Sequence, residues 1–145
     1  MEQRARQAGP VERAVRSHHP TESVLFEAGA LDRELAAAGR AGAACSPDAS
    51  WEALIRSMQS FSSHYPAILL RSTEALGALG QACLDGMRQA PGVVLRERAA
   101  SLLVDMLGRV VDEVQREGPD RVPGEVPTTM ERLLGSLASD RRHAR

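Results

Sequence analysis

The chain of 145 residues contains no lysine, so all 18 of its basic residues are arginine. This absence excludes Schiff-base catalysis and phosphate binding by a P-loop, since both need a lysine side chain. Histidine and cysteine are scarce as well, at four and two residues, and the sequence has no Gly-x-Ser-x-Gly or Gly-x-Gly-x-x-Gly motif. Because a catalytic nucleophile needs a base and an orienting group beside it, the sequence predicts a protein that is not an enzyme, with no catalytic residue, cofactor or metal site.

The two cysteines, Cys45 and Cys83, fit neither a disulfide-rich scaffold nor a metal site with paired ligands. We therefore expect both to be reduced thiols of an intracellular protein. The first residues lack the apolar segment of a signal peptide, and no apolar run approaches the roughly 18 residues that cross a membrane. The expected location is the cytoplasm, the nucleus or both, without a membrane partner.

Neither sign of charge is in excess, because 19 acidic residues stand against 18 basic ones and the net charge is −1. Both signs are spread along the chain, so we expect no nucleic-acid partner. Aromatic residues amount to only 3% while hydrophobic residues reach 43%, and a core must therefore be built from Leu, Val, Ala and Met. That composition favours helices packed on helices, and the length suits one domain. The predicted fold class is all-α.

The two ends of the chain differ in character from its middle. Residues 1–20 are polar, rich in arginine and interrupted by glycine and proline, so we predict a mobile arm with at most one turn of helix and no part in the core. Residues 21–140 are predicted to form a single helical domain. Residues 141–145 form a charged tail, which we expect to be solvated.

Hydrophobic residues recur at helical spacing in five segments of the middle part, and these predict helices at about residues 22–38, 50–65, 73–88, 94–117 and 128–139. The clearest stripe lies in the second segment, at i, i+3, i+4, i+7, i+10 and i+14, and consists of Trp51, Leu54, Ile55, Met58, Phe61 and Tyr65. The fourth segment carries a stripe so wide that we expect it to contact more than one neighbour.

Proline and glycine mark the ends of these segments. Pro66 ends the second helix because it lacks an amide proton, and Ser72 or Thr73 can cap the third. Three glycines within the third helix lower its intrinsic stability, so it must depend on close packing. The stretch 119–127, with three prolines, is predicted to be a loop, followed by a capping box of Thr128 and Glu131.

The candidate residues for packing or partner contact cluster around the joint between the second and third helices. We expect five packing anchors, namely Trp51, Leu54, Phe61, Leu69 and Leu102. Tyr65 and Pro66 form the joint itself. Arg71 follows three apolar residues, so its guanidinium either satisfies carbonyls at the end of the preceding helix or contacts an acidic partner. We favour the structural role.

The order of these elements resembles a known repeat architecture. The helix from Trp51 to Phe61, the joint Pro66-x-x-Leu69-Leu70-Arg71-Ser72 and the run from Arg96 to Leu107 look like the carboxy-terminal HEAT-type repeats of the importin-β superfamily, closest to its transportin-SR branch. The resemblance covers roughly residues 51–115. The segments before Trp51 and after Pro119 depart from the pattern.

The resemblance implies a short HEAT-like stack of helical repeats that recognises a protein cargo in nuclear transport, without the amino-terminal repeats that bind Ran. A stack with few repeats leaves an apolar flank open, so we expect a protein partner or self-association. The alternative is a small helical bundle with flexible termini, an unrelated regulatory adaptor that binds a partner helix in a groove. In either case the function is protein–protein interaction.

Overall fold

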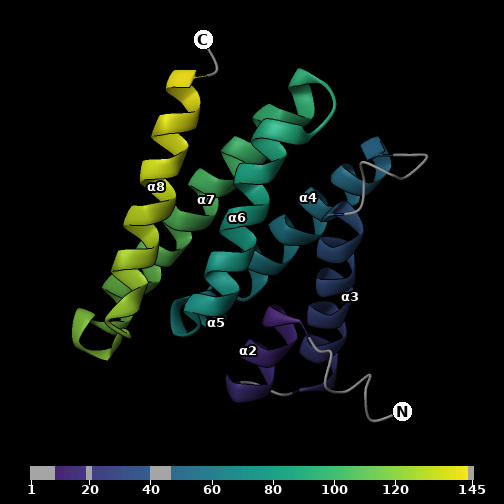
Figure 1. Ribbon diagram of the computed structural model, residues 1–145. Coiled ribbons are helices and arrows are strands. Elements are labelled where there is room, and N and C mark those ends of the chain that lie inside the picture. The colour runs from purple at the N-terminus through teal and green to yellow at the C-terminus, as the bar shows by residue number, and fades with distance from the viewer. Residues whose placement is uncertain (1–8, 19–20, 40–46, 144–145) are drawn as a thin grey trace.

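The computed structural model describes residues 9–18, 21–39 and 47–143, and within these ranges the protein consists of seven α-helices and one 3-10 turn (Figure 1). The helices are α2 (Pro10–His18), α3 (Glu22–Gly39), α4 (Pro47–His64), α5 (Pro66–Arg71), α6 (Thr73–Gln89), α7 (Val93–Glu117) and α8 (Glu125–His143), and the turn is η2 (Pro119–Arg121). The prediction of an all-α fold is confirmed. None of the helices in the described ranges is long and apolar enough to cross a membrane.

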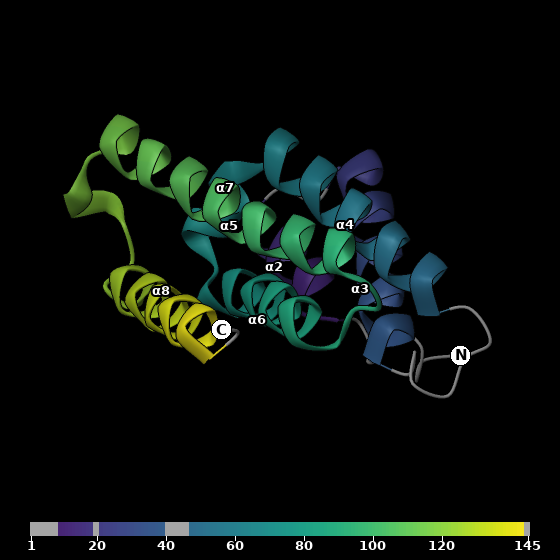
Figure 2. The same cartoon turned by 90° about the horizontal axis from the view of Figure 1, so that it is seen from above.

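The helices lie in two layers around a shared core. Figure 2 shows α4 beside α7 in one layer and α6 beside α8 in the other, with α6 packed under α7. At the amino-terminal end α3 packs against α4, and α2 fits between α3 and α6. The core joins all of these helices through fully buried side chains such as Leu31, Met58, Phe61, Leu76 and Met106. Helix α7 contacts α4, α5 and α6, as its wide stripe predicts.

The joint between α4 and α6 contains a short helix of its own. Helix α4 ends at His64, and Pro66 is the first residue of α5, where its missing amide proton costs no hydrogen bond. Ser72 closes α5 and caps α6, because its Oγ accepts a hydrogen bond from the amide nitrogen of Ala75 at 3.1 Å. Of the two predicted caps, the structure thus has Ser72.

Helix α6 packs closely at two of its glycines. A Cβ atom added to Gly80 would lie 2.6 Å from Cδ1 of Leu133 in α8. One added to Gly86 would lie 3.0 Å from the Cβ of Ala99 and 3.2 Å from the ring of Trp51. The prediction that this helix depends on close packing is confirmed at both positions, because neighbouring helices occupy the space of the missing side chains.

The prediction that residues 1–20 form a mobile arm outside the core is wrong for residues 10–18. They form α2, and its side chains Val11 and Val15 are fully buried. The carboxylate of Asp32 in α3 accepts hydrogen bonds from the amide nitrogens of Val11 at 3.2 Å and Glu12 at 2.9 Å. Helix α2 is therefore capped from another helix, which its own sequence does not reveal. Residues 1–8 and 19–20 lie outside the described ranges.

The carboxy-terminal helix is longer than predicted. Helix α8 begins at Glu125 rather than after a loop that ends at Pro127, because proline is tolerated in the first turn of a helix. Thr128 and Glu131 consequently lie inside α8 and are not its capping box. The helix also continues through residues 141–143, which were predicted as a tail. Helix α4 likewise starts at Pro47, three residues before the predicted start.

The other predicted boundaries differ from the observed ones by one residue or less. Helices α3, α6 and α7 were expected at 22–38, 73–88 and 94–117 and are found at 22–39, 73–89 and 93–117. Residues 40–46, between α3 and α4, lie outside the described ranges, as do residues 144–145 of the tail.

Candidate functional site

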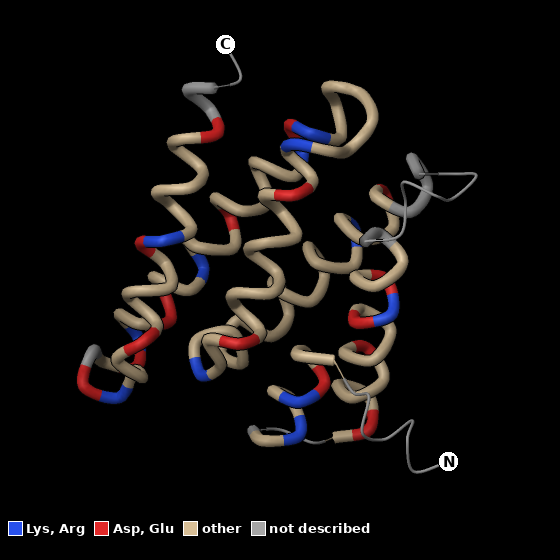
Figure 3. The backbone as a smooth tube through the Cα atoms, in the orientation of Figure 1, with Lys and Arg blue, Asp and Glu red and all other residues tan. Residues whose placement is uncertain are grey.

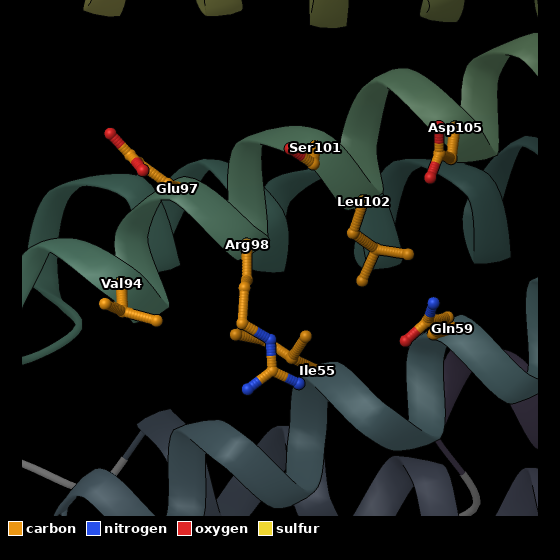
Figure 4. A pocket seen from close by; sticks show the side chains of 8 residues that line it. All are labelled: Ile55, Gln59, Val94, Glu97, Arg98, Ser101, Leu102 and Asp105. Atoms are coloured by element: carbon orange, nitrogen blue, oxygen red, sulfur yellow. The ribbon is translucent and has the colours of Figure 1, made fainter.

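A groove between α4 and α7 is a concave feature of the part of the chain that the structure describes. It has a volume of about 330 Å³ and lies between two helices that pack side by side (Figure 4). Two lining residues come from α4 and six from α7, and they are Ile55, Gln59, Val94, Glu97, Arg98, Ser101, Leu102 and Asp105. We refer to this feature as the α4–α7 groove.

Helical periodicity places the lining residues. On α7 they fall at i, i+3, i+4, i+7, i+8 and i+11 from Val94, which is one face of a helix. The floor consists of Ile55 and Leu102, which are only 2% and 5% exposed and pack toward the core. At one end of the groove Val94 is 66% exposed. Among the apolar residues of the lining, Val94 is thus the one that the chain leaves largely uncovered.

Charged side chains line the α7 side of the groove. Figure 4 shows Arg98 extending from α7 toward Ile55 of α4. Its Nη1 lies 3.8 Å from Oε2 of Glu52, an oxygen that also accepts a hydrogen bond from Nη2 of Arg56 at 3.4 Å. Glu97 and Asp105 form no hydrogen bond or ion pair with any residue that the structure describes. Over the molecule as a whole, basic and acidic positions are interspersed along the helices (Figure 3).

Of the eight candidate residues from the sequence, only Leu102 lines the groove. Trp51, Leu54, Phe61 and Leu69 are buried in the core, as expected of packing anchors. These residues therefore shape the helices that border the groove without reaching its surface.

The remaining three candidates lie at the joint around α5. The hydroxyl of Tyr65 donates a hydrogen bond to Oε2 of Glu27 at 3.0 Å, and its ring packs against Phe61 at a centroid distance of 5.1 Å. This hydrogen bond, followed by burial, raises the pKa of Tyr65 above its ordinary value. Pro66 starts α5. Tyr65 thus ties α4 to α3.

Arg71 has a structural role, although not the one expected. Its Nη2 donates a hydrogen bond to Oε1 of Glu117 at 2.6 Å, so the guanidinium pairs with a carboxylate at the end of α7. Neither the carbonyls of the preceding helix nor an acidic partner is needed to explain it. The pair ties α5 to α7, which pack against each other.

The polar side chains of the groove lining are Gln59, Glu97, Arg98, Ser101 and Asp105. Its lining lacks histidine and cysteine. Cys83 is fully buried, and burial raises the pKa of its thiol to about 12, so it is a poor nucleophile at neutral pH. Within residues 9–18, 21–39 and 47–143, no three His, Cys, Asp or Glu side chains are placed to hold a metal ion. Cys45 lies outside these ranges.

Sequence reasoning did not single out seven of the eight groove residues. Ile55 is predicted from the sequence to lie in the buried stripe of its helix, and only the packing of α7 against α4 brings Ile55 and Gln59 next to the α7 residues of the groove. The signal that was available is Val94, an apolar residue at the solvated start of a helix, with Ser101 two turns further on. Such a pattern is weak, because single exposed apolar residues are common on protein surfaces.

Comparison of the chain with models of protein families, with curated proteins and with solved structures finds no match. The protein is thus a small all-helical protein for which no family is identified, and its function must be inferred from the groove and the residues around it.

Proposed function

We propose that the protein is a non-enzymatic interaction module that binds an α-helix of a partner protein in the α4–α7 groove. The observation that carries this proposal is the combination of a buried apolar floor, Ile55 and Leu102, with Val94 exposed beside it. Burial of the exposed side chain of Val94 under a partner side chain stabilises the complex by about 25 cal/mol per Å² of apolar surface. The rim of polar and charged residues would then orient the partner.

A helix suits this groove better than an extended peptide. Every regular element in the described ranges is helical, so the groove has no strand edge that could pair with the backbone of an extended segment. A helix satisfies its own backbone hydrogen bonds and needs only side-chain contacts. Its apolar residues at i, i+3, i+4 and i+7 would lie along the trough between α4 and α7.

Two adjacent valines of α7 allow a matched test. Val94 lines the groove and is 66% exposed, whereas Val93 is 57% exposed and does not line it. A fluorescent amphipathic peptide with leucines at i, i+3, i+4 and i+7 and glutamine elsewhere serves as the probe, and its affinity is measured by anisotropy. We expect Val94→Asp to weaken binding at least about tenfold, because it places a charge against the apolar face. Val93→Asp should change the affinity for the peptide by less than about twofold.

Two results would refute the groove proposal. One is equal loss of affinity in both variants, which would indicate a general effect of negative charge on α7. The other is that the wild-type protein does not bind the peptide at all. Both substituted side chains are exposed, so circular dichroism and thermal melts should show that each variant keeps the wild-type fold.

We propose as a second function that the protein recognises a protein cargo, as the likeness of residues 51–115 to repeats of nuclear transport receptors implies. The packing of α6 against α7 as an antiparallel pair joined by a short turn, with α4 and α8 extending the two layers, supports this proposal (Figure 2). With this second function we propose that the protein acts in the cytoplasm, the nucleus or both.

The transport proposal has its own experiment. Purified protein is used to pull down Ran-family GTPases and a cargo domain rich in Ser-Arg dipeptides. We expect the cargo domain to bind and the GTPases not to bind, since the repeats that contact Ran are not among those that the chain resembles. If neither binds while the helical peptide does, the transport proposal is wrong and the groove proposal stands alone.

A further inference from the structure

We propose that the helix which the α4–α7 groove accepts is basic, with arginine or lysine side chains that pair with Glu97 and Asp105. This inference rests on the proposed function and adds the charge of the partner to it. Both carboxylates line the groove, and both are exposed. Neither has a hydrogen-bond or ion-pair partner among the described residues, so both remain available to a partner protein.

The single cation in the lining does not cancel this preference. Nη1 of Arg98 lies 3.8 Å from Oε2 of Glu52, so the chain itself offsets its charge. Arg56 on α4 donates to the same carboxylate oxygen at 3.4 Å. Two arginines thus share Glu52, and the carboxylates that remain for a partner are Glu97 and Asp105. Electrostatic complementarity of this kind sets the orientation and specificity of an interface more than its affinity.

The distance between the two carboxylates along α7 matches the distance between basic residues on a partner helix. Glu97 and Asp105 are eight residues apart on α7, which corresponds to about 12 Å along the helix axis. Figure 4 shows them near opposite ends of the groove, with Leu102 between them. A partner helix lying along the trough has the same rise per residue. Basic residues seven or eight positions apart on such a helix would therefore reach both carboxylates.

The test compares three peptides that share one apolar face and carry lysine, glutamine or glutamate at their other positions. Anisotropy should rank the affinities as lysine, then glutamine, then glutamate. Raising the salt concentration should reduce the difference in affinity between the lysine and glutamine peptides, because salt screens exposed charges. We expect Asp105→Arg to weaken binding of the lysine peptide by about threefold to tenfold, the range for an exposed pair that becomes repulsive.

Glu131→Arg is the matched control. Glu131 is exposed on α8, in the other layer of the protein, and its replacement changes the net charge by the same amount. This variant should bind the lysine peptide as the wild-type protein does, to within about twofold. The double variant Glu97→Arg/Asp105→Arg should reverse the ranking and prefer the glutamate peptide.

The outcomes separate the two proposals. If all three peptides bind equally and Val94→Asp still abolishes binding, the groove proposal holds and the basic partner is refuted. The basic partner would also be refuted if the wild-type protein preferred the glutamate peptide, or if Asp105→Arg and Glu131→Arg had equal effects. If none of the three peptides shows binding that depends on Val94, the groove proposal itself fails.

Discussion

Asp32 shows how a single side chain can decide whether a segment joins the core. Its carboxylate caps the start of α2 from the neighbouring helix, with hydrogen bonds of 3.2 and 2.9 Å to two amide groups. Burial of this carboxyl group raises its pKa above 3.8, even though the two amide hydrogen bonds act in the opposite direction. The cap therefore carries an electrostatic cost once Asp32 is ionised.

The first prediction concerns this cap. Asp32→Ala removes both acceptors and should lower the free energy of unfolding by about 1 to 2 kcal/mol, the range for loss of a helix cap. Asp32→Asn keeps one acceptor and should lower the free energy of unfolding by less than Asp32→Ala does. Urea unfolding, followed by circular dichroism, measures both. If α2 did not pack as described, neither substitution would change the midpoint.

The pH dependence of the same variants tests the direction of the pKa shift. Because the folded-state pKa is raised, the folded protein binds more protons than the unfolded chain just above pH 3.8, and this stabilising contribution is lost as the pH rises through the folded-state pKa. The stability of the wild-type protein relative to Asp32→Asn should therefore fall as the pH rises above about 4. A relative gain as the pH rises would mean that the pKa is lowered.

At the scale of helices, the contact between α6 and α8 depends on one missing side chain. A Cβ at Gly80 would lie 2.6 and 2.7 Å from the two Cδ atoms of Leu133, closer than carbon atoms pack. Helix α8 also meets α6 near the carboxy-terminal ends of both helices, where Nε of Arg88 donates to Oδ2 of Asp140 at 3.0 Å. The register of α8 on α6 is thus set by a glycine near the middle of α6 and an ion pair near its end.

The second prediction compares two glycines in helix interiors. Gly108→Ala on α7 should stabilise the protein by about 0.5 to 1 kcal/mol, because alanine favours the helix and nothing lies within 4 Å of the added Cβ. Gly80→Ala gains the same helix propensity but forces Leu133 to move, and overpacking of this kind costs about 1 to 3 kcal/mol. We expect Gly80→Ala to lower the stability of the protein. Thermal melts of both variants give the comparison, and an equal gain for Gly80→Ala would show that α8 does not pack closely there.

At the scale of the whole molecule, Cys83 reports on the integrity of the core. Its thiol is fully buried on α6, and burial raises its pKa from 9.0 to about 12. The third prediction uses a Cys45→Ser variant, in which Cys83 is the one remaining cysteine. We expect a maleimide reagent at about pH 8 not to label Cys83 until urea unfolds the protein, since only an exposed thiolate reacts. Rapid labelling without urea would mean that the layers separate readily in the native state.

The raised pKa of Cys83 also affects stability in alkali. A group with a raised folded-state pKa contributes stability that is fully present below its ordinary pKa, here 9.0, and is lost as the pH rises toward about 12. Between about pH 9 and pH 11, the wild-type protein should therefore lose stability relative to a Cys83→Ala variant. Parallel unfolding curves over that interval would show that the thiol is accessible in the folded state.

Local sequence determined the helices of the middle part of the chain. The stripe from Trp51 to Phe61, the boundary at Pro66 and the cap at Ser72 depend on neighbouring residues, and all three are observed. Helical periodicity and the missing amide proton of proline act over a few residues, which is why the sequence alone sufficed. The dependence of α6 on close packing could be predicted from its glycines in the same way.

Only the tertiary structure decided which segments far apart in the chain meet. The cap on α2 comes from Asp32, about 20 residues away, so the burial of Val11 and Val15 could not be predicted from their polar surroundings. The groove joins Ile55 to Leu102, which lie on different helices. Such contacts follow from how helices pack, a property of the whole core rather than of any local pattern. The sequence thus determined the helices, and their packing determined the site.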